Sequence, residues 1–230
     1  MLPLLIYFCL KKISRAKFTG LAGILKKLIV KHTVISIITL LIIMLLVTCL
    51  SFGQYLQLNY KVMYKGEEIG RLKMEKIDSV NTSLLKLNSE IKKRIIILFS
   101  VIEKEEALFE NGVLLSSFLY RRVNENVKAN QRTSYAGNYY FVRKEKSSKD
   151  VMIDGIRYNQ LSLYFSEPEN IKQFYSDNYL CLINIEKINN HVYKIKLPDN
   201  NTNYYQYSEG VCTKVILDHK LFKIEFVLSQ

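Results

Sequence analysis

The chain has 230 residues, 49% of them hydrophobic, and its 33 basic and 21 acidic residues give a net charge of +12. Seven basic residues and no acidic residue precede Gly53, so residues 54–230 have a net charge of only +5. Nucleic-acid-binding proteins concentrate their cations in one patch or along one helix, whereas these cations are scattered along the expected strands. We therefore expect no nucleic-acid partner.

Residues 32–60 contain no charged side chain, and the 19 residues from 34 to 52 are mostly Val, Ile, Leu and Met. A helix of about 20 apolar residues crosses the hydrocarbon core of a bilayer. Residues 34–53 are thus predicted to be a signal peptide or a transmembrane helix. The basic leader, residues 1–33, stays in the cytoplasm by the positive-inside rule. The membrane positions that we single out are Val34, Leu41 and Phe52.

Three fates of this segment are open, and we favour cleavage. Ser51 and Gly53 place small residues at positions −3 and −1 before Gln54, which is the pattern of a signal-peptidase site. A leader of 33 residues is long for a signal peptide, and a chain that starts near Val30 would have an ordinary one. Without cleavage the segment is an inner-membrane anchor, and lipid attachment at Cys49 is the third alternative.

Residues 54–230 are expected to form one extracytoplasmic domain, periplasmic or otherwise held in the cell envelope, either anchored or released. Its first strand alternates apolar and polar residues, which is the period of a half-buried strand. The residues expected on its apolar face are Leu56, Leu58, Tyr60, Val62 and Tyr64. A turn at residues 65–68 leads to a return strand with Gly70, Leu72 and Met74 on one face, which predicts an antiparallel hairpin.

The dipeptide Asn111-Gly112 favours positive φ and predicts a second hairpin turn, between a strand ending at Phe109 and a strand over Val113–Val123. The other expected strands are Leu84–Ile91, Arg94–Val101, Ser134–Lys144, Tyr179–Ile188, His191–Leu197, Tyr204–Tyr207, Val211–Leu217 and Phe222–Leu228. Residues 158–176 break the pattern. Pro168 removes a ladder donor, and Ser166 with Glu169 has the spacing of a helix capping box.

About ten antiparallel strands with one apolar face each bend that face around a shared interior. The sequence therefore predicts an all-β fold, a single antiparallel curved sheet or partly open barrel of about ten strands. One short helical segment lies within it, and one N-terminal hydrophobic helix precedes it. The irregular residues 158–176 either close one end of the barrel or lie as a lid over a binding site.

Cys181 and Cys212 are the only cysteines after Gly53. Export would permit a disulfide between them, but Cys212 is expected on the side of its strand opposite to Val215, so we favour two buried thiols. Together with His191 and His219 they are the only soft metal ligands of the domain, and their spacing fits no close-paired zinc pattern. We expect no metal and no cofactor.

The motifs of nucleophilic or metal-dependent hydrolysis, Gly-x-Ser-x-Gly and His-Glu-x-x-His, do not occur in the sequence. We therefore assign no catalytic residue. The enzymatic alternative is a hydrolase of envelope material that uses polar residues near the irregular segment. Its candidate residues are Glu167, Glu169, Asp177 and His191.

Aromatic residues are the one chemical bias of the domain, since 15 of the 16 tyrosines follow Gly53 and the chain has no tryptophan. Tyrosine suits a half-buried pleated face, so these residues line the core in one interpretation. In the other, Tyr and Phe line the concave face of the sheet and hold an apolar or amphiphilic ligand. The candidate ligand-binding residues are Tyr139, Phe141, Tyr164, Tyr204 and Tyr205.

A series of short stretches runs along the domain: Tyr60-Lys61-Val62 to Gly66, Ile69-Gly70-Arg71-Leu72, Phe109-Glu110-Asn111-Gly112, Ser116-Ser117, Leu163-Tyr164-Phe165, Glu167-Pro168, Tyr175-Ser176-Asp177, Tyr193 to Asp199, Asn203-Tyr204-Tyr205 and Gly210-Val211-Cys212. In these stretches the chain resembles a family of exported proteins from Bacteroidota that is known as a domain of unknown function. The resemblance implies a relation to exported half-barrel proteins and brings no catalytic residue. Asn200 replaces an expected glycine, a mild departure because Asn tolerates the left-handed conformation.

These observations predict a non-catalytic protein of the cell envelope. Its curved sheet would hold an apolar or amphiphilic, lipid-like ligand, or an open sheet edge would dock an envelope protein by strand addition. The further partners are the inner membrane, through residues 34–52, or signal peptidase, near Gly53. The hydrolase and a structural or surface-interaction role without a pocket are the alternatives.

Overall fold

A computed structural model describes residues 31–44, 53–94, 98–145, 147–220 and 222–229 of the chain. The chain divides into two compact units, Met1–Phe52 and Gly53–Gln230. In the first unit, residues 31–44 form a helix that includes Val34 and Leu41, both exposed. No helix within the described residues is long and apolar enough to cross a membrane.

The predictions for the N-terminal segment are only partly covered by this helix. Residues 45–52, which include Cys49 and Phe52, lie outside the described residues, as do residues 1–30 of the leader. The signal peptide, the membrane anchor and the lipid-attachment site therefore stay predictions.

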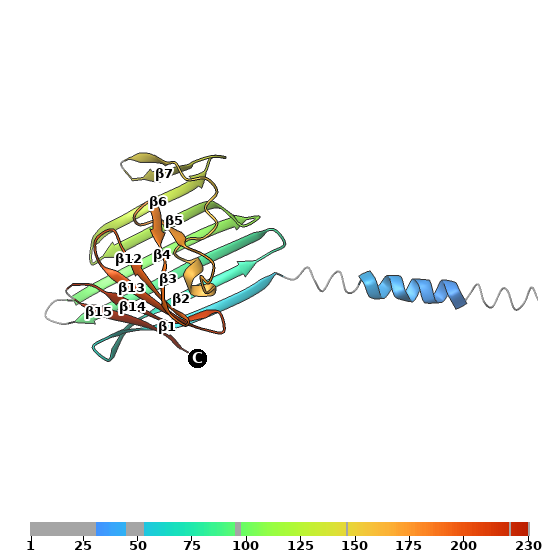
Figure 1. The fold of residues 1–230 in the computed structure, drawn as a ribbon, viewed down its shortest axis with the longest axis horizontal. Coiled ribbons are helices and arrows are strands. Elements are labelled where there is room, and N and C mark those ends of the chain that lie inside the picture. Colours follow the sequence, from blue (N-terminus) through green and yellow to red (C-terminus); the bar gives the residue numbers. More distant parts are fainter. Residues whose placement is uncertain (1–30, 45–52, 95–97, 146, 221, 230) are drawn as a thin grey trace, which may run out of the picture. The chain divides into compact units, whose positions relative to one another are not determined.

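The second unit consists almost entirely of β-strands, fifteen of them within its described residues (Figure 1). They are β1 (Gln54–Tyr64), β2 (Glu67–Asp78), β3 (Thr82–Arg94), β4 (Leu98–Glu110), β5 (Val113–Val123), β6 (Asn126–Tyr135), β7 (Tyr140–Lys144), β8 (Ser148–Val151), β9 (Gln173–Ser176), β10 (Cys181–Asn184), β11 (Glu186–Asn189), β12 (Val192–Lys196), β13 (Thr202–Ser208), β14 (Val211–Asp218) and β15 (Lys223–Ser229). One short helix, α2 (Ser162–Phe165), lies in the irregular segment where it was predicted.

Thirteen of these strands form one antiparallel sheet in the order β11-β12-β13-β14-β15-β1-β2-β3-β4-β5-β6-β7-β8, and β9 pairs with β10 in a second, small sheet. Strand β15 pairs with β1, which joins the last strand of the chain to the first. Because β11 and β8 lie at the two ends, the sheet is open. The predicted antiparallel, open all-β fold is confirmed, with more strands than the ten expected.

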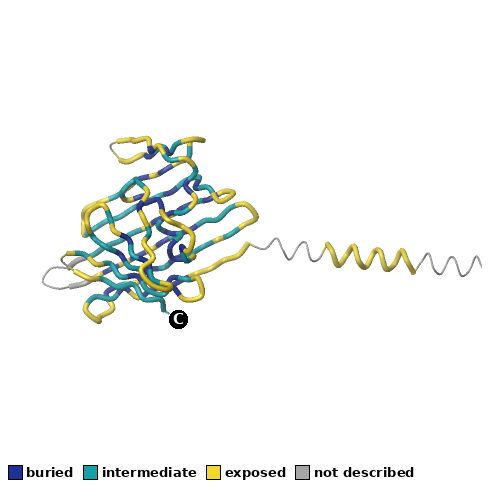
Figure 2. The backbone as a smooth tube through the Cα atoms, viewed as in Figure 1, coloured by how far each residue is buried: buried dark blue, intermediate teal, exposed yellow. Residues whose placement is uncertain are grey.

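The sheet curves until its two halves share one core. Residues of β1–β5 and of β12–β14 belong to a single cluster of buried side chains (Figures 1 and 2). The hydroxyl of Tyr60 on β1 donates a hydrogen bond of 2.7 Å to the carbonyl of Cys212 on β14, in the buried interior. Bulges, such as the one between Val62 and Met63, add local twist and help the sheet to bend.

The hairpin predictions at the start of the domain are confirmed. Lys65-Gly66 and Asn111-Gly112 both adopt positive φ, as a tight two-residue turn requires. Leu58, Tyr60 and Val62 are buried on β1, as are Leu72 and Met74 on β2, whereas Leu56 is exposed.

Three strand predictions are wrong in their boundaries. The predicted Arg94–Val101 strand spans the end of β3 and the start of β4, which pair with each other. Ser134–Lys144 is two strands, because the chain turns at Gly137, where φ is 95°. Tyr179–Ile188 is divided between the small and the large sheet at Ile185, whose N–H donates to the carbonyl of Lys172 at 2.8 Å. In each case the sequence pattern of a strand continues across a point where the chain turns or passes to another sheet.

The predicted capping box does not begin a helix. Ser166 follows the last residue of α2 instead of preceding its first. The side chain of Asn159 accepts the N–H of Ser162 at 3.2 Å, so an upstream residue supplies the polar contact at the start of this short helix.

Candidate functional site

Tyr164 and Tyr205, two of the five predicted ligand-binding residues, meet on the concave side of the sheet. Tyr164 lies on α2 and Tyr205 on β13, with ring centroids 6.2 Å apart in an edge-to-face arrangement. The ring of Tyr60 on β1 lies 5.6 Å from that of Tyr164. All three residues are at most 3% exposed. They form the interior of the curved sheet.

The other three predicted aromatic residues do not line the concave face, and the expectation that all five share it is wrong. Tyr204 is half-buried on the opposite face of β13, because neighbouring residues of a strand point to opposite sides. Phe141 is placed in the same way beside the buried Tyr140. Tyr139 precedes β7 in the turn around Gly137.

Tyrosine rings fill the concave side, and several hydroxyls are bound to the chain's own backbone. The largest fully buried side chains include Tyr60, Tyr140, Tyr175, Tyr193 and Tyr205. Tyr140 donates to the carbonyl of Leu114 at 3.0 Å, and Tyr207 donates to that of Leu163 at 2.8 Å. These hydroxyls are satisfied by the protein, as buried polar groups generally are. The core interpretation of the tyrosines therefore describes the concave face better than a ligand-lined cavity does.

Asp177 is the buried carboxylate of the domain's main polar network. It follows β9, and its Oδ1 accepts hydrogen bonds from Ser117 on β5 at 2.5 Å and from Thr133 on β6 at 3.2 Å. The side-chain amide of Gln131 donates to the Asp177 backbone carbonyl. Burial raises the pKa of Asp177 to about 6, although the two hydroxyl hydrogen bonds act in the opposite direction.

Glu105 on β4 and Arg121 on β5 extend this network. Burial, and next the charge of Glu103, raise the pKa of Glu105 well above its usual range. Arg121 donates from Nε to Glu103 at 2.8 Å, and its Nη2 lies 4.0 Å from a carboxyl oxygen of Glu105. Its Nη1 donates to Asn178 at 3.1 Å, so the network ties the β9–β10 hairpin to the sheet.

The hydrolase candidates fall into different surroundings. Nδ1 of His191 lies 2.9 Å from one carboxyl oxygen of Glu167, and the hydroxyl of Tyr193 donates to the other oxygen at 2.8 Å. Burial acts to raise the pKa of Glu167, but these hydrogen bonds outweigh it and lower the pKa. Glu169 is exposed, and Asp177 makes its contacts on β5 and β6. The structure brings together Glu167 and His191, not the four residues.

Both cysteines of the domain are free thiols. Cys181 is half-buried on β10 of the small sheet, and Cys212 is buried on β14 of the large one. The expected facing of Cys212 is wrong, because it shares the inner face with Val215. A bulge opposite Gln206 and Tyr207 inserts Thr213 as an extra residue and reverses the alternation. The described residues contain no group of three or more His, Cys, Asp or Glu side chains that could hold a metal ion.

A hollow with a volume of about 780 Å³ lies on the outer face of β1–β4. Tyr60, Leu72, Ser89 and Glu103 are directly opposite one another on the four strands, and they form its floor. The hollow is also lined by the residues on either side of this row, whose side chains point away from the core. They are Asn59, Lys61, Arg71, Lys73, Asn88, Glu90, Ile102 and Lys104, with Ser229 at the margin.

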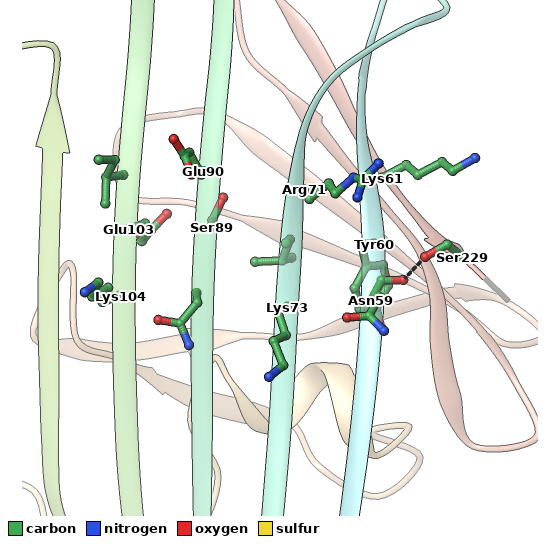
Figure 3. A pocket seen from close by; sticks show the side chains of 13 residues that line it. Asn59, Tyr60, Lys61, Arg71, Lys73, Ser89, Glu90, Glu103, Lys104 and Ser229 are labelled. Atoms are coloured by element: carbon green, nitrogen blue, oxygen red, sulfur yellow. Dashed lines mark hydrogen bonds between the residues drawn. The ribbon is translucent and has the colours of Figure 1, made fainter.

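We name this hollow the outer groove. Figure 3 shows its side chains over four neighbouring strands, with the strands of the other half of the sheet behind them. Strands lie about 4.8 Å apart, so β1 to β4 span about 14 Å. The sequence contained one signal for this site, the polar alternation of β1 and β2, which we interpreted only as the solvent-facing side of a hairpin.

Fold and geometry define an open antiparallel β-barrel with a filled interior and a groove on its outer face. The chain belongs to the family described as "Domain of unknown function (DUF6134)", whose model matches residues 60–229. Membership of a family of unknown function, which the short motifs predicted, is thereby confirmed. Origin in Bacteroidota and export stay predictions.

One solved structure that resembles this chain comes from Brucella abortus and is described as "Crystal Structure of Beta-barrel-like Protein of Domain of Unknown Function DUF1849". The two are 8% identical, with a TM-score of 0.49, over 78% of this chain and 97% of that one. No curated protein matches the chain.

Proposed function

We propose that this chain is a non-catalytic binding protein of the cell envelope, and that it holds an amphiphilic ligand in the outer groove. The groove is the observation that carries the proposal. Its volume of about 780 Å³ lies within the range of small-molecule sites, and its polar groups stand around a floor of strand backbone. The concave side, by contrast, is occupied by buried tyrosine rings.

The side chains of the outer groove suit a ligand with both apolar and polar parts. Ile102 is a half-buried apolar wall on β4. The hydrocarbon stems of Lys61 and Lys104 add apolar surface while their ammonium groups stay in water, as lysines do at amphipathic boundaries. The amides of Asn59 and Asn88 offer neutral hydrogen-bond donors and acceptors.

The envelope location rests on the N-terminal sequence. An apolar stretch over residues 34–53 follows a leader that carries seven basic and no acidic residues, which favours export of the domain through the inner membrane. A protein delivered there meets lipids and lipid-linked polymers, the amphiphiles to which the outer groove is suited.

Native mass spectrometry of the full chain, released from a nonionic detergent in the presence of phosphatidylcholine, tests the proposal. Ile102→Trp fills the outer groove with a larger side chain. Val127→Trp is the matched control, because Val127 is 49% exposed on β6 and does not line the groove. We expect the wild type and Val127→Trp to retain lipid adducts of equal occupancy. Ile102→Trp should bind the lipid with an affinity about tenfold lower.

Equal adduct occupancy in all three proteins would contradict the proposal. It would mean that the lipid is bound by the N-terminal segment alone, where a substitution at residue 102 has no effect. The circular dichroism of both variants would have to match that of the wild type, so that a loss of binding reports the groove and not an unfolded domain.

A further inference from the structure

The outer groove is lined by an excess of positive charge. Four cations surround it, Lys61 on β1, Arg71 and Lys73 on β2 and Lys104 on β4. Glu90 is the outward-facing acid among its described lining residues, and Lys92 already forms an ion pair with it. The other acid, Glu103, points to the inner face, where it accepts hydrogen bonds from Arg121.

Lys61 and Arg71 occupy directly opposite positions of the β1–β2 pair. Like charges at such positions repel each other, which is unfavourable in a sheet unless an anion lies between them. On its other side Lys61 is opposite Val227 of β15, which brings no negative charge. Arg71 is in turn opposite Glu90 on β3, whose carboxylate is also in an ion pair with Lys92. The strand register therefore leaves Lys61, and not Arg71, without an acid at a directly opposite position.

The protein's own acids pair with two of these four cations. Within the described part of the chain, the side chains of Lys61 and Lys104 have no hydrogen-bond or ion-pair partner, whereas Lys73 pairs with Glu75 at 2.9 Å. Arg71 lies 3.1 Å from Glu68, but its side chain is 85% exposed, and exposed ion pairs contribute little. The guanidinium of Arg71 therefore keeps donors that can turn toward an anionic oxygen.

From these contacts we propose that the outer groove selects an anionic phospholipid. Its phosphate lies between Lys61 and Arg71, and its acyl chain follows the apolar wall at Ile102. This inference rests on the proposed function, because it names the head-group chemistry of the ligand that the same groove holds. A phosphate oxygen accepts charge-assisted hydrogen bonds from lysine and arginine, and these are stronger than bonds between neutral groups.

Native mass spectrometry with two lipids of identical acyl chains, phosphatidylglycerol and phosphatidylcholine, tests the inference on the full chain. We expect the wild type to prefer phosphatidylglycerol, and the double variant Lys61→Gln/Lys104→Gln to lose about tenfold of that preference. The matched control is Lys128→Gln/Lys172→Gln, which removes two exposed lysines that do not line the groove. The control should keep the wild-type preference for phosphatidylglycerol. Added salt should weaken this preference in the wild type and in the control alike.

The outcomes separate the two proposals. If both lipids bind equally and Ile102→Trp still abolishes binding, the charge selection is wrong while the groove remains a lipid site. If Ile102→Trp changes nothing for either lipid, the proposed function itself fails. If inorganic phosphate displaces phosphatidylglycerol at concentrations near those of the lipid, the site takes a free anion, and the commitment to a lipid is overturned.

Discussion

Asp177 combines a buried carboxyl group with a specific set of hydroxyl donors. It is 7% exposed, and burial raises its pKa to about 6 from an ordinary value of 3.8. A carboxyl group whose pKa is raised on folding binds its proton more tightly in the folded state, so protonation stabilises the fold. This contribution is fully present below pH 3.8 and is lost as the pH rises through about 6.

We therefore expect the free energy of unfolding to fall by about 1 kcal/mol between pH 5 and pH 8 through Asp177 alone. Asp177→Asn keeps an oxygen for Ser117 and Thr133 but cannot ionise, so its stability should change less over this range. Urea denaturation followed by circular dichroism at both pH values measures the difference. The lowered pKa values of Glu75, Glu90, Glu167 and Asp199 place their titration below this window. Equal pH dependence in both proteins would contradict the assignment.

Tyr204 and Tyr205 are neighbours with opposite roles. Tyr205→Ala removes a ring that is 1% exposed and in edge-to-face contact with Tyr164, so we expect a loss of about 3–5 kcal/mol in the free energy of unfolding. Tyr204→Ala removes a half-buried ring from the outer face, for a loss of about 1 kcal/mol or less. Denaturation curves of the two variants check the difference. A larger loss of stability for Tyr204→Ala would mean that Tyr204, and not Tyr205, faces the core.

At the residue scale, the sequence predicted side-chain facing where alternation is regular and failed where a bulge interrupts it. Leu58, Tyr60 and Val62 are buried as expected, but Cys212 is not on the predicted face, because Thr213 is an extra residue. A bulge leaves no mark in composition. The Asp177 network could not be predicted from the sequence either, because its partners lie on β5 and β6, far away in sequence.

Strand β2 contains Gly70, a position at which the backbone of β3 lies too close for a side chain. A Cβ atom at Gly70 would lie 2.4 Å from the carbonyl oxygen of Glu90 and 2.7 Å from the Cα of Ile91, both on β3. Real Cβ atoms do not come so close, so β2 and β3 would have to separate beside the bulge at Val62 and Met63. The glycine is thus a requirement of the strand pairing under the outer groove.

Gly70→Ala is expected to cost about 3 kcal/mol of unfolding free energy through this overpacking. Gly66→Ala is the matched control, because Gly66 has a positive φ of 84° and an added Cβ meets no atom within 4 Å. The control should cost about 1 kcal/mol, the strain of a left-handed residue alone. Thermal unfolding of both variants measures this order, and an equal cost would mean that β2 and β3 tolerate a wider spacing.

At the element scale, strands bounded by clear turn signals could be predicted, and strands joined through apolar sequence could not. Asn111-Gly112 ends β4 and begins β5 as expected. Between β3 and β4 the sequence is Ile95-Ile96-Ile97, which carries no turn residue and lies outside the described residues. The strand predicted over Arg94–Val101 therefore crossed from one strand into the next.

At the scale of the whole domain, the thirteen-stranded sheet of the described residues ends in two edge strands, β8 and β11, and both are short and charged. Edge β8 has four residues and includes Lys149 and Asp150, and edge β11 has four residues with Glu186, Lys187 and a bulge. Short, charged or bulged edges disfavour pairing with another strand. Two copies of β8 paired about a two-fold axis, in the registers centred on Lys149 or Asp150, would place like charges opposite each other.

Strand addition at these edges is accordingly a weaker hypothesis than binding in the outer groove. We expect Lys149→Val/Asp150→Val to increase self-association over the wild type, because it removes the charges that protect β8. Light scattering after size-exclusion chromatography measures the mass of both proteins under identical conditions. A wild type that associates as strongly as the variant would show that these charges do not guard the edge.

The central claim is that a ligand of this protein lies on the outer face of β1–β4 and not on the concave face. Phosphatidylglycerol with a photoreactive group in its acyl chain, irradiated with the full chain, would mark the place directly. We predict saturable attachment to peptides that contain Lys61, Arg71 or Ile102, reduced by excess unlabelled lipid. Attachment to Tyr164 or Tyr205 instead would locate the ligand among the interior tyrosines and contradict the account.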